Sequence, residues 1–165
     1  MAKVKILPYN QNFQKIFGKK KREISQVIQN CKIYHIGSTA VPNLGGKGII
    51  DIMIAINDFK KVKNVIERLK DMGFTHIHPE EEGRIFLSTE KETKIGSFHI
   101  HLVEKGGEAH KELLFFRDYL RENREEAEKY FKLKLKWKRE AKEERSVYTK
   151  LKTDYIKSIN EKNKR

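Results

Sequence analysis

Residues 49–56 constrain the fold of this chain more than any other part of the sequence. They read IIDIMIAI, an almost unbroken run of branched apolar residues. Such a run is typical of a strand in the middle of a sheet, where other parts of the protein cover both faces. Asp51 interrupts the run, and an ionised carboxylate in a covered strand is costly unless a cation or several hydrogen-bond donors meet it. We therefore expect Asp51 either to be paired or to face a cleft in a functional role.

The remaining pattern predicts an α+β fold around this strand. Apolar residues at helical spacing predict one helix before it, one after it and three more in the C-terminal part. Alternating residues predict later strands that pair as antiparallel hairpins. The predicted strands are 4–7, 32–36, 49–56, 74–78, 83–89 and 96–104, and the predicted helices are 11–30, 58–72 and three within 108–160, with breaks near 122–124 and 144–146. We expect a single domain, 1–165, with its sheet core in about 1–105.

The net charge of the chain indicates which kinds of partner it can attract. The chain of 165 residues has 36 Lys and Arg against 23 Asp and Glu, a formal net charge of +13. The surplus lies at the two ends, because 10 basic and 3 acidic residues precede residue 61 and 18 basic and 11 acidic residues follow residue 110. This raises the local concentration of polyanions such as nucleic acid, nucleotides or phosphorylated metabolites. A Lys-rich chain with solvated helix faces has the same composition, so both interpretations stay open.

No segment has the features of a membrane span or a signal peptide. No run approaches the roughly 20 apolar residues that cross a bilayer, and the N-terminal residues are too few and too charged for a leader. The single cysteine, Cys31, allows neither an internal disulfide nor a thiolate metal cluster, and we expect a small buried or half-buried thiol. We expect a cytoplasmic protein without membrane contact, and the sequence leaves its oligomeric state open.

A glycine-serine turn precedes the central strand. Gly37 and Ser38 follow a predicted strand, and Lys47 lies in the loop that leads to Asp51. Glycine lets the backbone approach a phosphate, and a serine hydroxyl and the N–H groups of a following helix can hold phosphate oxygens. A nearby aspartate can hold a Mg²⁺ ion that bridges those oxygens. The arrangement favours a site for a nucleoside triphosphate, although a Gly-Ser pair can also simply turn the chain.

These residues resemble a known family. The run HIGSTAVPNLGGKGIIDI, together with FHIHLVEKGG, LLFFRDYLR and YTKLKTDYI, resembles the GrpB (UPF0157) family over about residues 4–159. The resemblance implies a small, mixed, largely antiparallel sheet flanked by helices, with the nucleotidyltransferase fold of the polymerase β type. In that superfamily a Gly-Ser pair opens a helix that grips nucleotide phosphates, and a later strand carries two acids one residue apart. Gly37, Ser38 and Asp51 match these positions, but Met53 stands where the second acid is expected.

The missing acid bears on the choice of metal. Two Mg²⁺ ions ordinarily need several carboxylates, which one aspartate cannot supply. His99 and His101 lie on one face of a predicted strand where the family would place a third acid, and imidazole favours Zn²⁺, Mn²⁺ or Fe²⁺ over Mg²⁺. The candidate metal ligands are His35, Asp51, His99 and His101. Alternatively, the histidines line the cleft or form hydrogen bonds with backbone groups.

Basic side chains on the predicted C-terminal helices are further candidates for phosphate binding. Three arginines recur at i, i+4 and i+7 of one helix and so share a stripe: Arg117, Arg121 and Arg124. Asp118 can pair with two of them, which would give the stripe a structural role instead. Lys134 and Lys152 fit the family pattern on otherwise apolar helix faces, and we expect them to reach a cleft or an acid.

The leading hypothesis is a protein that binds a nucleotide or a phosphorylated small molecule, with metal-dependent nucleotidyl transfer as its enzymatic form. In that form Asp51 and Ser38 are catalytic, and the residues expected to bind phosphate are Gly37, Ser38, Thr39, Lys47, Arg117 and Arg121. The expected cofactor is Mg²⁺ or Mn²⁺, or Zn²⁺ if the histidines are ligands, and no organic cofactor is expected. Two alternatives stay open: a metal-dependent hydrolase or transferase that uses the His/Asp set, and a non-catalytic protein that binds RNA or another polyanion through its basic surface.

Overall fold

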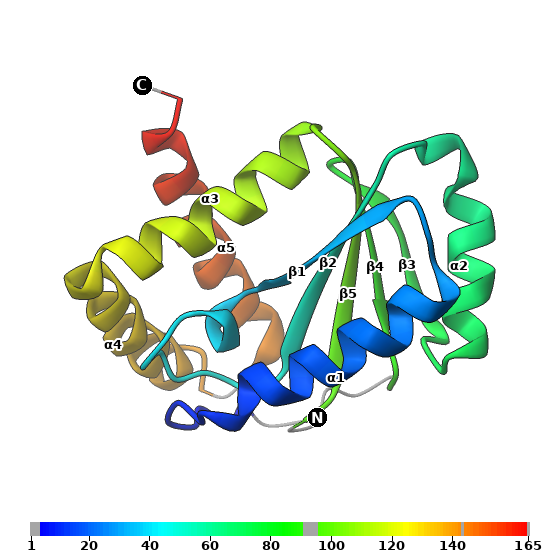
Figure 1. Ribbon diagram of the computed structural model, residues 1–165. Helices are drawn as coiled ribbons and strands as arrows, with labels where there is room; N and C mark the ends of the chain where they lie inside the picture. The colour runs from blue at the N-terminus through cyan, green and yellow to red at the C-terminus, as the bar shows by residue number, and fades with distance from the viewer. Residues whose placement is uncertain (1–3, 91–95, 143, 165) are drawn as a thin grey trace.

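The protein was analysed as a computed structural model that describes residues 4–90, 96–142 and 144–164 (Figure 1). Its sheet has the strand order β1-β2-β5-β4-β3. The strands are β1 (Cys31–Ile36), β2 (Ile50–Ile56), β3 (His76–Glu81), β4 (Arg84–Ser88) and β5 (Phe98–Glu104). β2 and β5 pair in parallel, and the other neighbours pair antiparallel. The expected α+β class with a mixed, largely antiparallel sheet is confirmed.

Helices cover both faces of the sheet. The helices are α1 (Asn12–Val27), α2 (Val62–Asp71), α3 (Glu108–Glu122), α4 (Arg124–Glu140) and α5 (Arg145–Lys162), with short 3₁₀ turns η1 (Ser38–Ala40) and η2 (Phe59–Lys61). α1 and α2 pack on one face, and α3 packs on the other together with α4 and α5, which complete a second apolar core (Figure 1). None of the described helices is both long enough and apolar enough to cross a membrane.

The central strand β2 divides its side chains between the two helical layers. Ile50, Ile52 and Ile54 belong to the core beneath α1 and α2. Met53 lies on the opposite face in a cluster with the first turns of α3. Because strand side chains alternate, Asp51 lies on the same face as Met53. The fold therefore directs the acid of the central strand toward the C-terminal helices.

Three predicted elements differ from the structure. The predicted strand 4–7 is wrong, because within the described residues only Leu7 makes a bridge there, exchanging two hydrogen bonds of 2.7 and 2.9 Å with Gly46. α1 ends at Val27 rather than at residue 30, since the backbone of Ile28 is extended. β3 continues through Pro79, which was placed in a connection, because a register shift between His78 and Glu81 lets this edge strand tolerate the missing N–H.

The C-terminal helices follow the predicted division. The first break falls at Asn123, and the second begins at Ala141, slightly earlier than predicted. In α5, Tyr148 is buried while its neighbour Val147 is 39% exposed. Cys31 is a half-buried free thiol, as expected.

Candidate functional site

The glycine-serine turn touches the acid of the central strand. Gly37 has φ +72° and immediately precedes η1, which begins at Ser38. A Cβ atom at Gly37 would lie 2.6 Å from Oδ2 of Asp51. Only glycine both adopts this left-handed conformation readily and leaves room for the carboxylate. The turn and Asp51, which are 14 residues apart in the sequence, are thus held against each other.

Two imidazoles meet Asp51 from the neighbouring strand. The Nε2 atom of His101 donates a hydrogen bond of 3.0 Å to Oδ1 of Asp51, and Nδ1 of His99 lies 3.5 Å from the same oxygen. Phe86 on β4 packs edge-on against both rings. Burial would raise the pKa of Asp51, but the hydrogen bonds and charges of the two histidines outweigh it and hold the pKa well below its usual value. The carboxylate is therefore ionised at neutral pH.

A small pocket opens beside this carboxylate. Its volume is about 50 Å³. Residues from η1, the following loop, two strands and two helices line it: Ser38, Lys47, Ile49, Asp51, His99, Lys134, Tyr148 and Lys152. We call this cavity the Ser38 pocket. It brings together the serine, the aspartate and one of the histidines that the sequence analysis singled out, together with both lysines expected to reach a cleft.

Lys134 is the most deeply buried cation of the Ser38 pocket. Only 1% of its surface is exposed, and its Nζ donates a hydrogen bond of 2.8 Å to the carbonyl oxygen of Gly45. The same Nζ lies over the ring of Tyr130, 4.5 Å from its centroid. A Cβ atom at Gly46 would lie 2.6 Å from Oγ of Ser38 and 3.3 Å from Nζ of Lys134. The serine hydroxyl and the ammonium group therefore flank one glycine.

Lys47 and Lys134 of the pocket are destabilised in their charged form. Burial, followed by repulsion from Lys152 and Arg145, lowers the pKa of Lys47 to about 7. Burial also holds the pKa of Lys134 well below its usual value, with Lys152 and Lys47 adding repulsion. Lys47 lies over the ring of Tyr148, 5.3 Å from its centroid. An anion that entered the pocket would relieve this repulsion and restore the protons.

His35 and Thr39 face away from Asp51 and bind each other. Nε2 of His35 lies 2.9 Å from Oγ1 of Thr39, and Nδ1 lies 3.4 Å from Oε1 of Gln14. The imidazole stacks on Phe17 with 4.5 Å between ring centroids. Burial, the largest cause, lowers the pKa of His35 to about 4. The structure thus gives these two side chains contacts that hold the turn in place.

The arginine stripe of α3 lies outside the lining of the Ser38 pocket. Arg117 donates to the carbonyl oxygen of His35 at 3.2 Å and to Asp118 at 2.7 Å. Arg121 donates to the carbonyl oxygen of Ala40 at 2.9 Å. Both guanidinium groups bind the backbone on either side of the Gly-Ser turn. Arg124 is exposed and pairs with Glu128 at 3.1 Å.

The arrangement of the candidate ligands decides which kind of metal site this protein can form. Asp51, His99 and His101 come together, whereas His35 does not join them. Among the described residues, no group of three or more His, Cys, Asp or Glu side chains is arranged to hold a metal ion. A self-contained metal site does not fit this geometry. Mg²⁺ that arrives with a phosphate needs only one or two protein carboxylates, and Asp51 fits that requirement.

Two residues of the pocket lining were missed in the sequence. Tyr148 and Ile49 were not singled out, although both line the cavity. The spacing of Tyr148 and Lys152, four residues apart in a predicted helix, was the available signal, because such residues share one helix face.

The strand order, the helices on both faces and the Gly-Ser turn against Asp51 define an α+β protein with a mixed sheet. A solved structure described as that of a cytoplasmic RNA terminal U-transferase superposes with a TM-score of 0.53, covering 78% of this chain and 42% of that one at 11% identity. At this identity the similarity concerns the fold alone.

The particular family follows from closer comparisons. A family model described as GrpB protein matches residues 3–162, and the chain belongs to the GrpB family. The crystal structure of GrpB from Enterococcus faecalis superposes with a TM-score of 0.81 at 26% identity and covers 96% of both chains. The UPF0157 protein YqkA of Bacillus subtilis is 34% identical over 125 residues, which are 72% of this chain and 35% of YqkA. The chain thus spans about a third of that relative.

Proposed function

We propose that the protein binds the phosphate end of a nucleotide or phosphorylated small molecule in the Ser38 pocket. One observation carries the proposal: three lysines from a loop and two helices line one pocket with Ser38 beside an ionised carboxylate. Burial, with a smaller contribution from mutual repulsion, lowers the pKa of Lys47 and Lys134, so an anion in the pocket would favour their charged forms. A phosphate group supplies the missing charge and accepts hydrogen bonds from all four side chains.

The size of the pocket limits what enters it. Sites that enclose a whole small molecule measure roughly 300–1,000 Å³, whereas the Ser38 pocket measures about 50 Å³. A single phosphate group therefore occupies it, and the rest of the ligand lies outside.

An enzymatic form of this proposal is nucleotidyl transfer. An acceptor oxygen would attack the α-phosphorus of a nucleoside triphosphate, and the bond to pyrophosphate would break. Asp51 would hold a divalent metal, which supplies charge neutralisation at the phosphates when bound. Lys47 and Lys152 would offset the charge on the departing pyrophosphate. With Met53 in place of a second acid, Asp51 is the one carboxylate of β2 available for this role.

Binding is tested by calorimetric titration with inorganic phosphate and with each nucleoside triphosphate, with and without Mg²⁺ or Mn²⁺. Lys152→Met should weaken phosphate binding at least about tenfold, as expected for a lost charge-assisted contact. Lys150→Met is the matched control, because Lys150 is exposed on the same helix and does not line the pocket. Equal affinities for the wild type and Lys152→Met would overturn the proposal.

The enzymatic form is tested by pyrophosphate release. The protein is incubated with each nucleoside triphosphate and either metal, and Asp51→Asn is assayed in parallel. Release that requires Asp51 would support nucleotidyl transfer. Phosphate binding without release would leave a binding protein, and release that is unchanged in Asp51→Asn would point to a contaminant.

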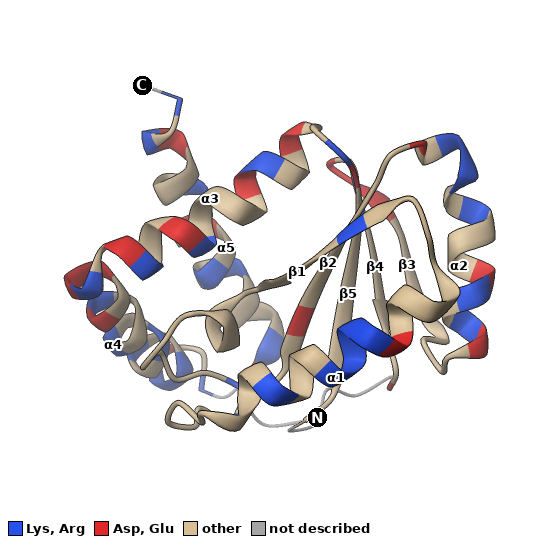
Figure 2. Ribbon diagram, in the orientation of Figure 1, with Lys and Arg blue, Asp and Glu red and all other residues tan. Residues whose placement is uncertain are grey.

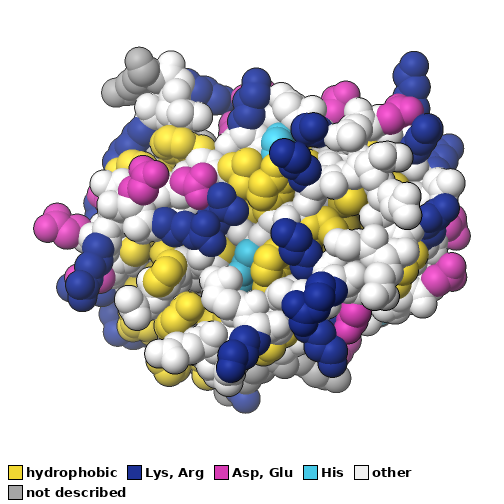
Figure 3. Space-filling view, in the orientation of Figure 1, with side chains coloured by type: hydrophobic (Ala, Val, Ile, Leu, Met, Phe, Trp, Pro, Cys, Tyr) yellow, Lys and Arg dark blue, Asp and Glu magenta, His cyan; other side chains and the backbone are white. Residues whose placement is uncertain are grey.

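A second candidate function is binding of RNA or another polyanion. Four basic residues follow one exposed stripe of α4 at helical spacing: Lys129, Lys132, Lys136 and Arg139. Figure 2 shows basic residues along α4 and α5, and Figure 3 shows Lys and Arg side chains spread over the visible face rather than gathered in one patch. This spread favours weak, sequence-independent contact with phosphates. It is compatible with a phosphate site in the Ser38 pocket.

A further inference from the structure

A larger pocket lies between the loop that follows η1 and the helices α3 and α4. Its volume is about 480 Å³, within the usual range for a small-molecule site. It shares no lining residue with the Ser38 pocket. Apolar side chains form half of the lining: Val41, Pro42, Leu120, Ala127 and Phe131. We call this cavity the Phe131 pocket.

The apolar wall of the Phe131 pocket is held in place by its neighbours. Val41, Leu120 and Ala127 are buried members of the second apolar core. Phe131 packs against that core and is half-buried. Its ring also fills the space that a Cβ atom at Gly45 would need, so it lies tightly against the loop. The wall is therefore formed before a ligand enters, and its aromatic ring is partly accessible.

Four charged side chains complete the lining: Arg121, Arg124, Glu128 and Lys132. Arg124 and Glu128 are exposed and pair with each other at 3.1 Å. Lys132 is exposed and makes no ion pair among the described residues. The charges of Arg121 and Lys132 thus remain beside an apolar wall, and they come from two different helices. This combination suits a ligand with an apolar body and one anionic end.

Arg121 has hydrogen-bond donors to spare. A guanidinium group carries five N–H donors in a planar fork. The Nε atom of Arg121 donates to the carbonyl oxygen of Ala40 at 2.9 Å, but its Nη1 atom lies 3.9 Å from Oδ1 of Asp118, beyond hydrogen-bond distance. The Arg121 side chain is 35% exposed and lines the pocket. Its terminal N–H groups are therefore available to a carboxylate.

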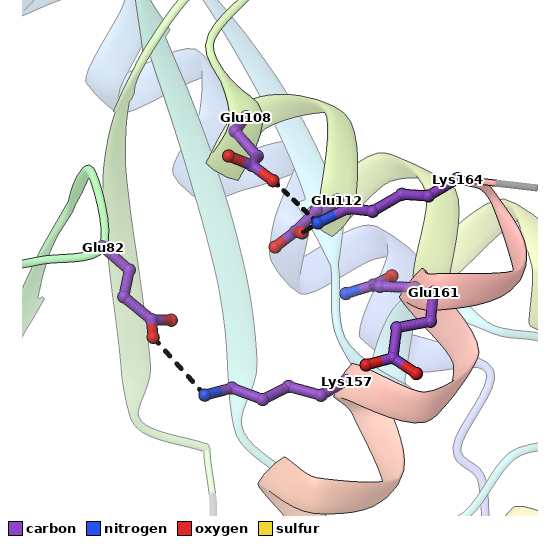
Figure 4. Close-up of a pocket in the computed structure, with 7 residues that line it drawn as sticks. Glu82, Glu108, Glu112, Lys157, Glu161 and Lys164 are labelled. Carbon is purple, nitrogen blue, oxygen red and sulfur yellow. Dashed lines mark hydrogen bonds and ion pairs between the residues drawn. The ribbon is translucent and has the colours of Figure 1, made fainter.

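Another cavity, of about 440 Å³, shows the contrast. It lies between the β3–β4 turn and the last turns of α5, and most of its lining residues are glutamates (Figure 4). Lysines of α5 already pair with these acids, since Lys164 lies 2.8 Å from Glu108 and Lys157 lies 3.4 Å from Glu82. In the lining of the Phe131 pocket, three cations face one carboxylate. An anion is therefore attracted to the Phe131 pocket.

We propose that the Phe131 pocket binds a small aromatic carboxylate. The ring of the ligand packs on Phe131 among the apolar side chains. Its carboxylate accepts hydrogen bonds from Arg121, whose planar fork matches the two oxygens, and Lys132 adds a second positive charge. The proposal does not depend on phosphate binding in the Ser38 pocket, because the two sites have no lining residue in common.

The test is a titration of the full chain with 2-naphthoate at low salt, followed by calorimetry and ligand-observed NMR. 2-Naphthylmethanol has the same ring system without a charge and should bind at least about tenfold more weakly. Decanoate has the same carboxylate on a flexible chain, which loses more conformational freedom on binding, and should also bind more weakly. Equal or tighter binding of either control ligand, or no binding of 2-naphthoate at millimolar concentration, would overturn the proposal.

Single substitutions place the ligand in this pocket. Lys132→Met should keep the fold, because Lys132 is exposed, and should weaken 2-naphthoate binding by about fivefold. Lys136→Met removes the same charge one turn further along α4, outside the lining, and should leave the affinity unchanged. Phe131→Leu should weaken 2-naphthoate binding by about fivefold but decanoate binding by less than about twofold. Unchanged affinity in Lys132→Met, or a loss in the Ser38 pocket variant Lys152→Met, would contradict the assignment.

Discussion

At the scale of single residues, the contact between Gly37 and Asp51 is what makes the site. The glycine lets a tight turn approach the carboxylate, and the two histidines of β5 keep that carboxylate ionised and oriented. The same turn places Ser38 in the lining of the Ser38 pocket.

Gly37→Ala should therefore cost more than an ordinary glycine substitution. It combines left-handed strain with a clash against Asp51, and we expect a loss of about 2–3 kcal/mol in the free energy of unfolding. Gly106→Ala is the matched control, because Gly106 has φ +82° and nothing within 4 Å of the added Cβ. That control should lose only about 1 kcal/mol. Urea unfolding measures both, and equal losses would show that the carboxylate moves aside freely.

Lys47 should make anion binding depend on pH. Its pKa of about 7 in the folded protein means that the side chain gains its proton as the pH falls from 8 to 6. Sulfate keeps two negative charges over this range, so its affinity should rise by about tenfold as the pH falls. Lys134 contributes in the same direction, because burial lowers its pKa too.

The variant Lys47→Arg tests the origin of this dependence. Arginine stays charged, so the variant should bind sulfate with an affinity that changes little around pH 7. Lys47→Met should bind weakly at every pH. Calorimetry at pH 6, 7 and 8 separates these cases, and an unchanged profile in Lys47→Arg would assign the dependence to another group.

Some of these residues could be predicted from the sequence and others could not. Period-2 alternation places His99 and His101 on one face, and this prediction is confirmed. The cost of burying a charge predicts that Asp51 is either paired or faces a cleft, and the structure places it beside two histidines and in the lining of the Ser38 pocket. The contact of His35 with Thr39 was not predictable, because a side chain at a strand end can turn either way. Tyr148 was missed because Val147 beside it offered an equally apolar choice.

At the scale of elements, α3 holds the loop that carries the site. Arg117 and Arg121 donate to the carbonyl oxygens of His35 and Ala40, which precede and follow the Gly-Ser turn. These contacts join the C-terminal layer to the sheet at the turn. These contacts therefore indicate that α3 positions the Gly-Ser turn.

Arg121→Met separates this role from direct phosphate binding. The variant keeps the aliphatic stem but loses the hydrogen bond to Ala40, so we expect a loss of about 1–2 kcal/mol in the free energy of unfolding. Sulfate affinity should change less than about threefold, since the side chain does not line the Ser38 pocket. Lys152→Met, which removes a lining residue, should show the opposite pattern. A tenfold loss of sulfate affinity in Arg121→Met would instead make Arg121 a direct ligand.

The elements themselves were largely predictable because their signals are local. The apolar run of β2 and the helical periodicity of the C-terminal part identify elements without knowledge of their neighbours. The strand 4–7 failed because a strand needs a partner, and at this place Leu7 meets only Gly46. The continuation of β3 through Pro79 depends on its place at the sheet edge, which only the strand order reveals.

At the scale of the whole molecule, opposite charges are separated along one helix. α5 contributes Lys152 to the Ser38 pocket and Glu161 to a separate cavity that Glu82, Glu108 and Glu112 also line. The total charge of +13 therefore conceals an acidic region around the last turns of α5. A measurement with a polyanion reports the basic surface as a whole, whereas a small inorganic anion reports the Ser38 pocket alone.

RNA binding should follow the salt dependence of a basic surface. For a single-stranded oligonucleotide the slope of log K against log salt is about −0.7 per phosphate contact. Substituting the four exposed basic residues of the α4 stripe by Gln, namely Lys129, Lys132, Lys136 and Arg139, should make the slope shallower by up to about 3. Sulfate affinity in the Ser38 pocket should stay the same, because none of these residues lines it. Fluorescence anisotropy from 50 to 200 mM salt measures the slope. A flat response of the wild type would exclude polyanion binding, and an unchanged slope in the variant would place the contact on another surface.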